Sequence, residues 1–159
     1  MVRELGSWAI RFLLLTLAVS TLRRRLGAPG IMRFRRMVGL AAFYYAATHF
    51  TAYLWLLAAW DGGVIVSDLT ERPYIVVGFT ALVLLVPLAV TSTNAWRRRL
   101  GRRWLLLHRL VYPAMALVLL HEFWLTKDGF AEPVLYLAIF AGLMLERLLA
   151  RRARRRVRV

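Results

Sequence analysis

The stretch WLLLHRLVYPAMALVLLHEFW, residues 104–124, decides the fold of this chain. It is almost wholly apolar, and about 20 such residues are what an α-helix needs to cross the hydrocarbon core of a bilayer. It also carries His108 and His121, which are 13 residues apart. At about 1.5 Å per residue this spacing corresponds to about 20 Å along a helix, so one histidine is expected near each face of the membrane. Because an ionisable side chain inside a membrane is costly, both histidines indicate a functional site.

The same spacing indicates that the two histidines do not hold one metal ion together. Thirteen residues leave two side chains about 140° apart around an ideal helix. Pro113 lies between them and could kink the helix and redirect one of them.

Composition agrees with a membrane protein. Of 159 residues, 60% are hydrophobic, and the mean hydropathy is +0.58. The net charge of +15 could suggest nucleic acid. However, the arginines cluster in short blocks between apolar runs, which is typical of membrane proteins and predicts no nucleic-acid partner.

The absence of cysteine limits the cofactors that the chain can hold. It excludes disulfides, thiolate-ligated iron–sulfur clusters and covalent c-type haem. Any haem must therefore be a b-type haem held by side chains. The sequence contains neither G-x-G-x-x-G nor G-x-x-x-x-G-K-[ST], so no nucleotide-binding domain is expected.

Five apolar runs predict an all-α integral membrane bundle with five transmembrane helices. They are residues 8–22, 37–60, 74–92, 104–125 and 133–150. The first is interpreted as a retained helix rather than a signal peptide, because most of its charge follows it. Residues 27–30, 61–73 and 126–133 are expected to form turns and loops. Residues 1–150 then form one domain, and 151–159 form a basic cytoplasmic tail.

Charge segregation predicts the topology. Segments 23–36, 97–103 and 151–158 carry 17 arginines and no acid, whereas loops 61–73 and 126–133 carry two basic and five acidic residues. Since positive loops stay in the cytoplasm, the N-terminus is expected outside and the C-terminus inside. The arginine-rich tail also suits contact with anionic lipids of the bilayer.

Depth then assigns the histidines. His49 and His121 each fall in the outer half of the membrane, on different helices, which is the arrangement of two axial ligands of one haem iron. His108 falls near the cytoplasmic face and remains for a second, inner haem. Arg35 shares a helix face with His49, 14 residues away, and is either a contact of that inner haem or a topology and lipid anchor.

Plainer interpretations of these residues remain open. A histidine in a membrane can simply bond to a serine or carbonyl of a neighbouring helix. Aromatic side chains near His49 can be packing or an interface belt. Glu122 could orient the His121 ring or face the outer water.

Two blocks of the sequence resemble a known family. RPYIVVGFTALVLLVPLAVTSTNAWRRRLGRRWLLLHRLVY (72–112) and RRMVGLAAFYYAATHFTAYLW (35–55) are similar to the MsrQ (YedZ) family, the haem-binding membrane subunits of the periplasmic methionine sulfoxide reductase system. The likeness covers roughly residues 8–150. This family belongs to the wider ferric-reductase-like transmembrane group.

The resemblance implies cofactors, partners and a location. The family's haem-ligand histidines fall on His49, His108 and His121, holding one or two b haems, and a flavin, FMN, is associated with the family. Electrons come from the quinone pool or a cytosolic flavin reductase. They pass to a periplasmic molybdopterin methionine sulfoxide reductase catalytic subunit that repairs oxidised proteins. The location is the bacterial inner membrane. The family usually has six spanning helices, and this sequence corresponds to the last five.

The sequence thus predicts an electron-transfer subunit of an oxidoreductase system rather than its catalytic subunit. One alternative is a stand-alone transmembrane ferric or metal reductase, which needs the same haems. Another is a transporter that uses the histidines as a proton relay without haem.

Overall fold

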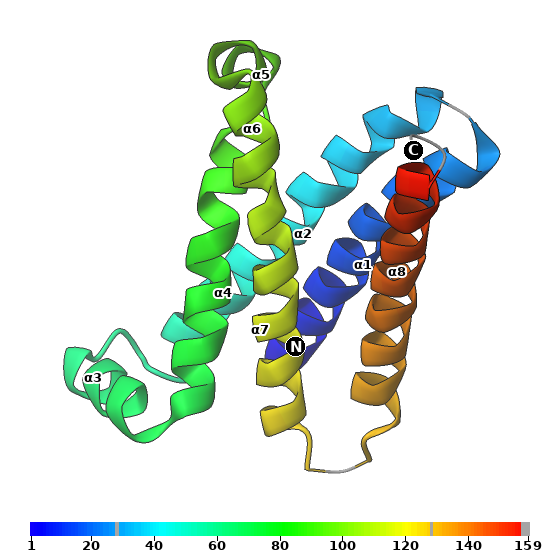
Figure 1. The fold of residues 1–159 in the computed structure, drawn as a ribbon. Helices are drawn as coiled ribbons and strands as arrows, with labels where there is room; N and C mark the ends of the chain where they lie inside the picture. The colour runs from blue at the N-terminus through cyan, green and yellow to red at the C-terminus, as the bar shows by residue number, and fades with distance from the viewer. Residues whose placement is uncertain (28, 128, 157–159) are drawn as a thin grey trace.

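The computed structural model describes residues 1–27, 29–127 and 129–156 of the chain. Within these ranges the chain is built of helices and contains no strand. The elements in order are α1 (Val2–Leu26), α2 (Met32–Leu56), α3 (Gly62–Glu71), α4 (Pro73–Val90), α5 (Asn94–Leu100), α6 (Arg102–Leu107), α7 (Val111–Leu125) and α8 (Ala131–Arg156), with 3-10 turns at Pro29–Ile31 and His108–Leu110. Figure 1 shows the long helices side by side in a bundle.

The described helices include four that are long and apolar enough to cross a membrane: α1, α4, the combined segment of α6 and α7, and α8. The fifth predicted crossing corresponds to α2, which has 25 residues and packs along α1. The tyrosine, threonine and histidine side chains of its central stretch make that stretch less apolar than those of the other four. The predicted all-α membrane bundle is confirmed.

The arginine-rich segments gather at one end of this bundle. The link from α1 to α2, the short helix α5 and the C-terminal end of α8 lie at the upper end in Figure 1. The N-terminus, α3 and the α7–α8 link lie at the opposite end. The helices therefore separate the basic segments from the acidic ones, as the positive-inside pattern requires.

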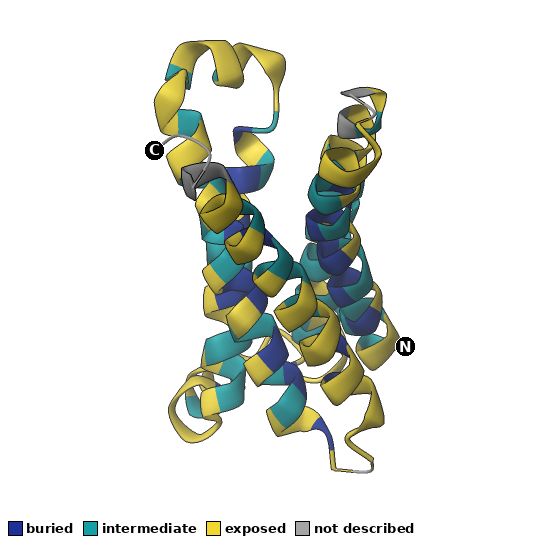
Figure 2. Ribbon diagram, turned by 45° about the vertical axis from the view of Figure 1, so that its right-hand side comes forward, coloured by how far each residue is buried: buried dark blue, intermediate teal, exposed yellow. Residues whose placement is uncertain are grey.

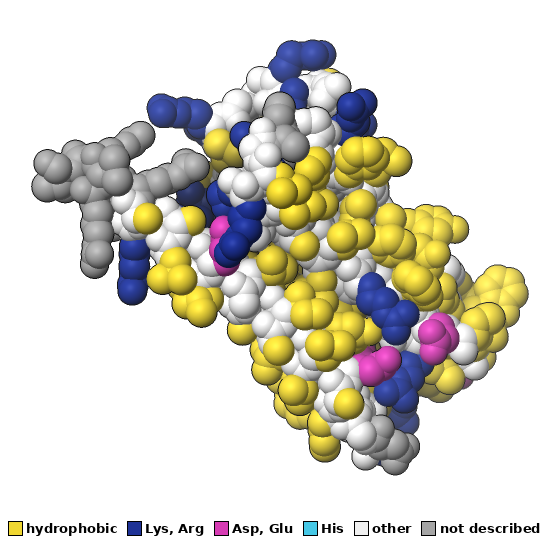
Figure 3. Space-filling view, turned by 90° about the vertical axis from the view of Figure 1, so that its right-hand side faces the viewer, with side chains coloured by type: hydrophobic (Ala, Val, Ile, Leu, Met, Phe, Trp, Pro, Cys, Tyr) yellow, Lys and Arg dark blue, Asp and Glu magenta, His cyan; other side chains and the backbone are white. Residues whose placement is uncertain are grey.

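The packed core takes residues from α1, α2, α4, α7 and α8. Leu17 of α1 and Met115 of α7 are fully buried there, and Ala114 provides space for close helix packing. Buried residues face inward along the helices in Figure 2. Figure 3 shows apolar side chains over much of the outer face, between charged groups toward the two ends. An apolar exterior of this kind suits contact with lipid.

The prediction that 61–73 is a loop is wrong, because most of this segment forms α3. The Asp61 side chain caps that helix by accepting from the backbone N–H groups of Gly63 and Val64, at 2.7 and 3.4 Å. Pro73 follows directly and begins α4. An aspartate at the N-cap and a proline just beyond the last residue are sequence signals of a helix. Here two glycines at the start of the segment favour a loop instead and hide these signals.

The segment 102–125 is interrupted, as Pro113 suggested, but the irregularity precedes the proline. His108–Leu110 forms a 3-10 turn between α6 and α7. Pro113 has no N–H to donate to the carbonyl of Arg109, which favours a tighter turn before it. At the other end of the chain, residues 151–156 of the predicted basic tail are helical and continue α8, and 157–159 lie outside the described residues.

Candidate functional site

A cavity of about 550 Å³ lies in the half of the bundle that carries the N-terminus and α3. Residues of α1, α2, α3, α4 and α7 line it, and its deeper wall is apolar, with Leu13, Leu85 and Val118. Its volume is within the usual range for a small-molecule or cofactor site. His49 and His121 both lie in its wall, and His108 does not.

His49 on α2 is held by the N-terminal turn of α1. Its Nδ1 is 2.9 Å from the carbonyl oxygen of Val2, so Nδ1–H donates to that oxygen and Nε2 is left free. Gly6, one turn further along α1, faces the ring: a Cβ at this position would lie 3.3 Å from Cε1 and Nδ1. The glycine therefore provides space for the imidazole.

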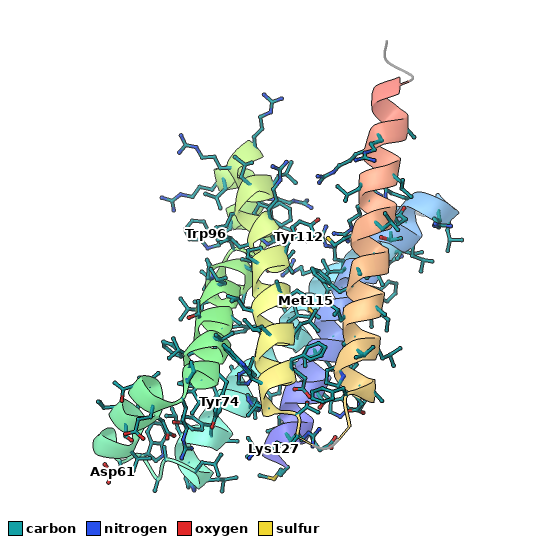
Figure 4. The ribbon with its side chains drawn as sticks, turned by 60° about the horizontal axis from the view of Figure 1, so that its bottom comes forward. Asp61, Tyr74, Trp96, Tyr112, Met115 and Lys127 are labelled. Atoms are coloured by element: carbon teal, nitrogen blue, oxygen red, sulfur yellow. The ribbon has the colours of Figure 1, made fainter. Side chains whose placement is uncertain are left out.

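His121 on α7 is held in the same way by α4. Its Nδ1 is 2.7 Å from the carbonyl oxygen of Tyr74, which again leaves Nε2 free. Gly78 lies one turn further along α4, and a Cβ there would be only 2.7 Å from Cε1 of the ring. Figure 4 shows Tyr74 at the end of the bundle that carries α3.

The two imidazoles come together across the cavity. Their ring centroids are 6.3 Å apart and their planes are inclined by 81°. Two metal–imidazole bonds of about 2.0–2.1 Å, each added to about 1.1 Å from Nε2 to its ring centre, separate two rings by about 6.3 Å. The distance between the ring centroids therefore equals that of two imidazoles bound to one metal ion from opposite sides. Ligand histidines commonly donate the other ring N–H to a carbonyl, as both do here.

The two halves of this site are related by an internal repeat that sequence reasoning missed. Each of three positions in the first half has a counterpart 72 residues later in the second. Val2, which provides the carbonyl, corresponds to Tyr74, Gly6 to Gly78 and His49 to His121. The pentapeptide RRRLG also occurs twice, at 23–27 and, 74 residues later, at 97–101, and both of its glycines have positive φ, +63° and +50°. A self-comparison of the sequence would reveal the repeat and point to both glycines.

Polar groups line the end of the cavity next to α3. Asp68 of α3 is buried, accepts from the Tyr53 hydroxyl at 2.7 Å and pairs with Arg72 at 3.2 Å. Glu122 also lies in the wall and is only 6% exposed. The Glu122 side chain is therefore not open to water. It is also not the partner of the His121 ring, because Nδ1 of His121 bonds to the carbonyl oxygen of Tyr74.

His108 lies apart from this cavity, at the start of the 3-10 turn. Its Nδ1 is 3.2 Å from the carbonyl of Trp104 one turn earlier, and its ring stacks on that indole with centroids 3.8 Å apart. The indole N–H donates in turn to the carbonyl oxygen of Thr91 at 2.9 Å. The His108 ring is therefore oriented by the Trp104 indole, which is itself held by the carbonyl at the C-cap of α4, and no hydrogen bond joins its Nε2 to the described residues.

Arg35 is separated from the outer pair of histidines. It lies in the first turn of α2, at the end of the bundle that carries the arginine-rich segments. Sequence reasoning did not identify Arg147, since an arginine before the C-terminal basic segment looks like one more topology residue. Among the described residues, no group of three or more His, Asp or Glu side chains could hold a metal ion.

The fold and site thus define a class: a multi-pass helical membrane protein with two facing imidazoles over an apolar cavity. Residues 5–119 match the family described as ferric reductase like transmembrane component. No solved structure matches the chain.

Relatives narrow this class. The chain is 52% identical over 139 residues to the protein-methionine-sulfoxide reductase heme-binding subunit MsrQ of Xanthomonas campestris pv. campestris strain 8004, a match covering 87% of this chain and 64% of that protein. The protein of the same name from Herminiimonas arsenicoxydans is 47% identical over 148 residues, or 91% of this chain and 68% of that one. The chain therefore belongs to the ferric reductase like transmembrane family and, within it, to the MsrQ group. It spans slightly less than two thirds of the length of the Xanthomonas relative.

Proposed function

We propose that this chain is a b-type haem subunit that carries electrons across the bacterial inner membrane. One observation carries the proposal: two imidazoles on different helices face each other at 6.3 Å, each with Nδ1 bonded to a carbonyl oxygen. That arrangement suits two axial ligands of one haem iron, His49 and His121. The haem-binding name of the similar Xanthomonas protein supports it.

The residues of the cavity would hold and shield the cofactor. The carbonyls of Val2 and Tyr74 fix the tautomer and orientation of the two ligands, which raises the basicity of their Nε2 atoms. The apolar wall excludes water and lowers the local dielectric, both of which affect the redox potential. Haem, when bound, supplies reversible one-electron oxidation and reduction.

A second haem would lie toward the cytoplasm, with His108 as one ligand. The stacked Trp104 ring and the 3-10 turn fix the direction of this imidazole. Arg35 lies in the same half of the bundle and is proposed as a cofactor contact there. The chain would then offer one site at each depth, which is what transfer across a membrane requires. Residues 1–150 form this haem-binding domain.

The partners are proposed from the family. The donor on the cytoplasmic side is the quinone pool or a cytosolic flavin reductase, and FMN is a candidate second cofactor. The acceptor is a periplasmic molybdopterin methionine sulfoxide reductase that repairs oxidised proteins. The acidic residues of α3 and of the α7–α8 link, which lie at one end of the bundle, would supply a charged docking surface for it. The C-terminus faces the cytoplasm, as the segregation of arginines requires.

The decisive experiment is an absorption spectrum with haem quantification on the full chain, purified from membranes of cells supplied with haem. We expect a Soret band and one or two b haems per chain. A colourless protein that still functions would overturn the proposal and favour the proton-relay alternative. Reduction of ferric chelates without any protein partner would favour the stand-alone reductase. Co-purification of a molybdenum protein would favour the proposed partner.

A further inference from the structure

The short helix α3 lies at the side of the bundle, where a membrane helix begins. It has 10 residues and is about 15 Å long, half of the roughly 30 Å that a helix must cross in a bilayer. Figures 1 and 4 both show it beside the end of α4, on the side away from α8. It leads directly into α4, which is long and apolar enough to span the membrane. Because lipid surrounds the sides of such a bundle, α3 lies at the level where bilayer and water meet.

The face of α3 that is turned to the protein is polar. Asp68 is the buried residue of this helix, and it accepts from the Tyr53 hydroxyl at 2.7 Å and pairs with Arg72 at 3.2 Å. Val64, about one turn earlier, lines the cavity together with Asp68. An amphipathic surface helix of a water-soluble protein would bury its apolar residues on this face. In α3 a carboxylate is buried there instead.

The remaining residues of α3 divide into two further faces. Apolar side chains fall on one of them at helical spacing: Ile65, Val66 and Leu69. Polar side chains fall on the other: Ser67, Thr70 and Glu71. Val66 is 62% exposed and Leu69 is 39% exposed, although both are apolar. The helix therefore presents an exposed apolar face and a polar face next to each other.

The segment that leads into α3 exposes two tryptophans. Trp55, in the last turn of α2, and Trp60 are both more than half exposed, at 69% and 60%. Ala59 and Trp60 have φ values of +46° and +58°, which are unfavourable for residues with a side chain. This strained turn leaves an indole outside the protein. Tryptophan is enriched at the surfaces of a bilayer, where its amphipathic ring lies at the level of the headgroups.

We propose that α3 is an interfacial helix that binds the lipid surface, with its apolar face toward the acyl chains and its polar face toward the water. The lipid is favoured over a protein partner because the apolar face continues a surface that already contacts lipid. Val76 and Phe79 of the adjoining spanning helix α4 are exposed, as Val66 and Leu69 are. The polar face remains open to water and to a soluble partner.

The binding is expected to depend on apolar contact and not on lipid charge. Interfacial helices that recognise anionic lipids carry lysine or arginine on the polar face. Residues 62–71 contain neither, and Arg72, which follows them, is paired with Asp68. The same seating is therefore expected in neutral and in anionic bilayers.

The test uses nitroxide labels, because the chain contains no cysteine. Leu69→Cys and Glu71→Cys place one label on the apolar face and one on the polar face, both at exposed positions. The full chain is studied in nanodiscs of phosphatidylcholine and of phosphatidylglycerol. Oxygen concentrates among acyl chains and a nickel chelate stays in water, so we expect the ratio of oxygen to nickel accessibility to be severalfold higher at Leu69→Cys.

Two outcomes of the labelling would overturn the proposal. If Leu69→Cys is as open to the nickel chelate as Glu71→Cys, α3 lies in water and its apolar face belongs to a protein partner. If the difference appears only in phosphatidylglycerol, lipid charge and not apolar contact holds the helix. Neither labelled position lines the cavity, so the result does not depend on whether haem is bound there.

A pair of charged variants tests the same contact through amide hydrogen exchange in nanodiscs. Leu69→Asp places a carboxylate on the apolar face and should speed exchange in residues 62–71 severalfold. Thr70→Asp adds the same charge to the polar face of the neighbouring residue and should leave exchange unchanged. Exchange in the long helices shows that each variant is folded. Equal effects of the two variants would contradict the proposal, and the labels decide alone if Leu69→Asp does not fold.

Discussion

Gly78 and His121 lie so close that a single methyl group cannot fit between them: a Cβ on Gly78 would be 2.7 Å from Cε1 of the ring. The His121 ring cannot move away freely, because its Nδ1–H is hydrogen-bonded to the carbonyl oxygen of Tyr74, which lies on α4 with Gly78. Helix α4 therefore determines the position of this imidazole in two ways. The Tyr74 carbonyl accepts its hydrogen bond, and the missing side chain of Gly78 leaves the space that the ring occupies. The relationship between Gly6 and His49 is similar but looser, at 3.3 Å.

This difference predicts a graded effect of alanine at the two glycines. Gly78→Ala should displace the His121 ring, break its bond to Tyr74 and lower the haem content of the purified protein severalfold. Gly6→Ala requires a shift of only a few tenths of an ångström and should alter the spectrum with little loss of haem. Both are measured by haem quantification and by the reduced-minus-oxidised absorption spectrum.

The matched control for these variants is Gly142→Ala on α8. A Cβ there meets no atom within 4 Å, and alanine favours a helix over glycine. Haem content should be unchanged. Equal losses in Gly78→Ala and Gly6→Ala would contradict the geometry, since only one of these positions is sterically closed.

Removing either facing imidazole should abolish one and the same haem signal. His49→Ala and His121→Ala each leave an iron with a single axial ligand, so we expect both to lose or greatly change the outer haem's spectrum, and the double variant to be no worse than either single one. His108→Ala is the internal control, because it lies outside the cavity and should spare this signal. An unchanged spectrum in His121→Ala would refute the ligand assignment.

The hydrogen bond from Tyr53 to Asp68 should hold α3 against the bundle. Tyr53→Phe removes a 2.7 Å hydrogen bond to a buried carboxylate, worth about 1.5–3 kcal/mol when the acceptor is charged. We expect faster amide hydrogen exchange in residues 62–71, with the long helices unaffected. Thr70→Ala is the control, because this exposed hydroxyl bonds only to carbonyls of its own helix. Equal exchange in Tyr53→Phe and the parent chain would show that other contacts hold α3.

Much of this architecture could be predicted from the sequence, because membrane insertion imposes simple rules. Long apolar runs must become helices, and arginine blocks stay on one side, so the depth of His49 and His121 follows from counting along the chain. That counting paired the two histidines whose rings lie 6.3 Å apart in the structure. It could not give the direction of their rings, which depends on the carbonyls of Val2 and Tyr74 from other helices.

Other parts were beyond sequence reasoning for physical reasons. The helix α3 is short, and its N-cap Asp61 lies beside two glycines that read as a loop. In the sequence, Arg147 looks like the arginines that follow it and that indicate the cytoplasmic side. Only its burial between α1 and α7 distinguishes it from them. Burial of a polar residue is a tertiary property, which local periodicity does not report.

The topology can be tested without background, because the chain contains no cysteine. Glu71→Cys places a thiol on an exposed residue at the end of α3, and Arg98→Cys places one on an exposed residue of α5 at the opposite end of the bundle. With a membrane-impermeant maleimide on spheroplasts, we expect Glu71→Cys to be labelled at once and Arg98→Cys only after the membrane is permeabilised. Detergent-solubilised samples of both variants should label equally, which checks that each thiol is accessible. The reverse pattern would place the arginine-rich end outside, and the proposed donor and acceptor would then have to exchange sides, since electrons could no longer enter from the cytoplasm near His108.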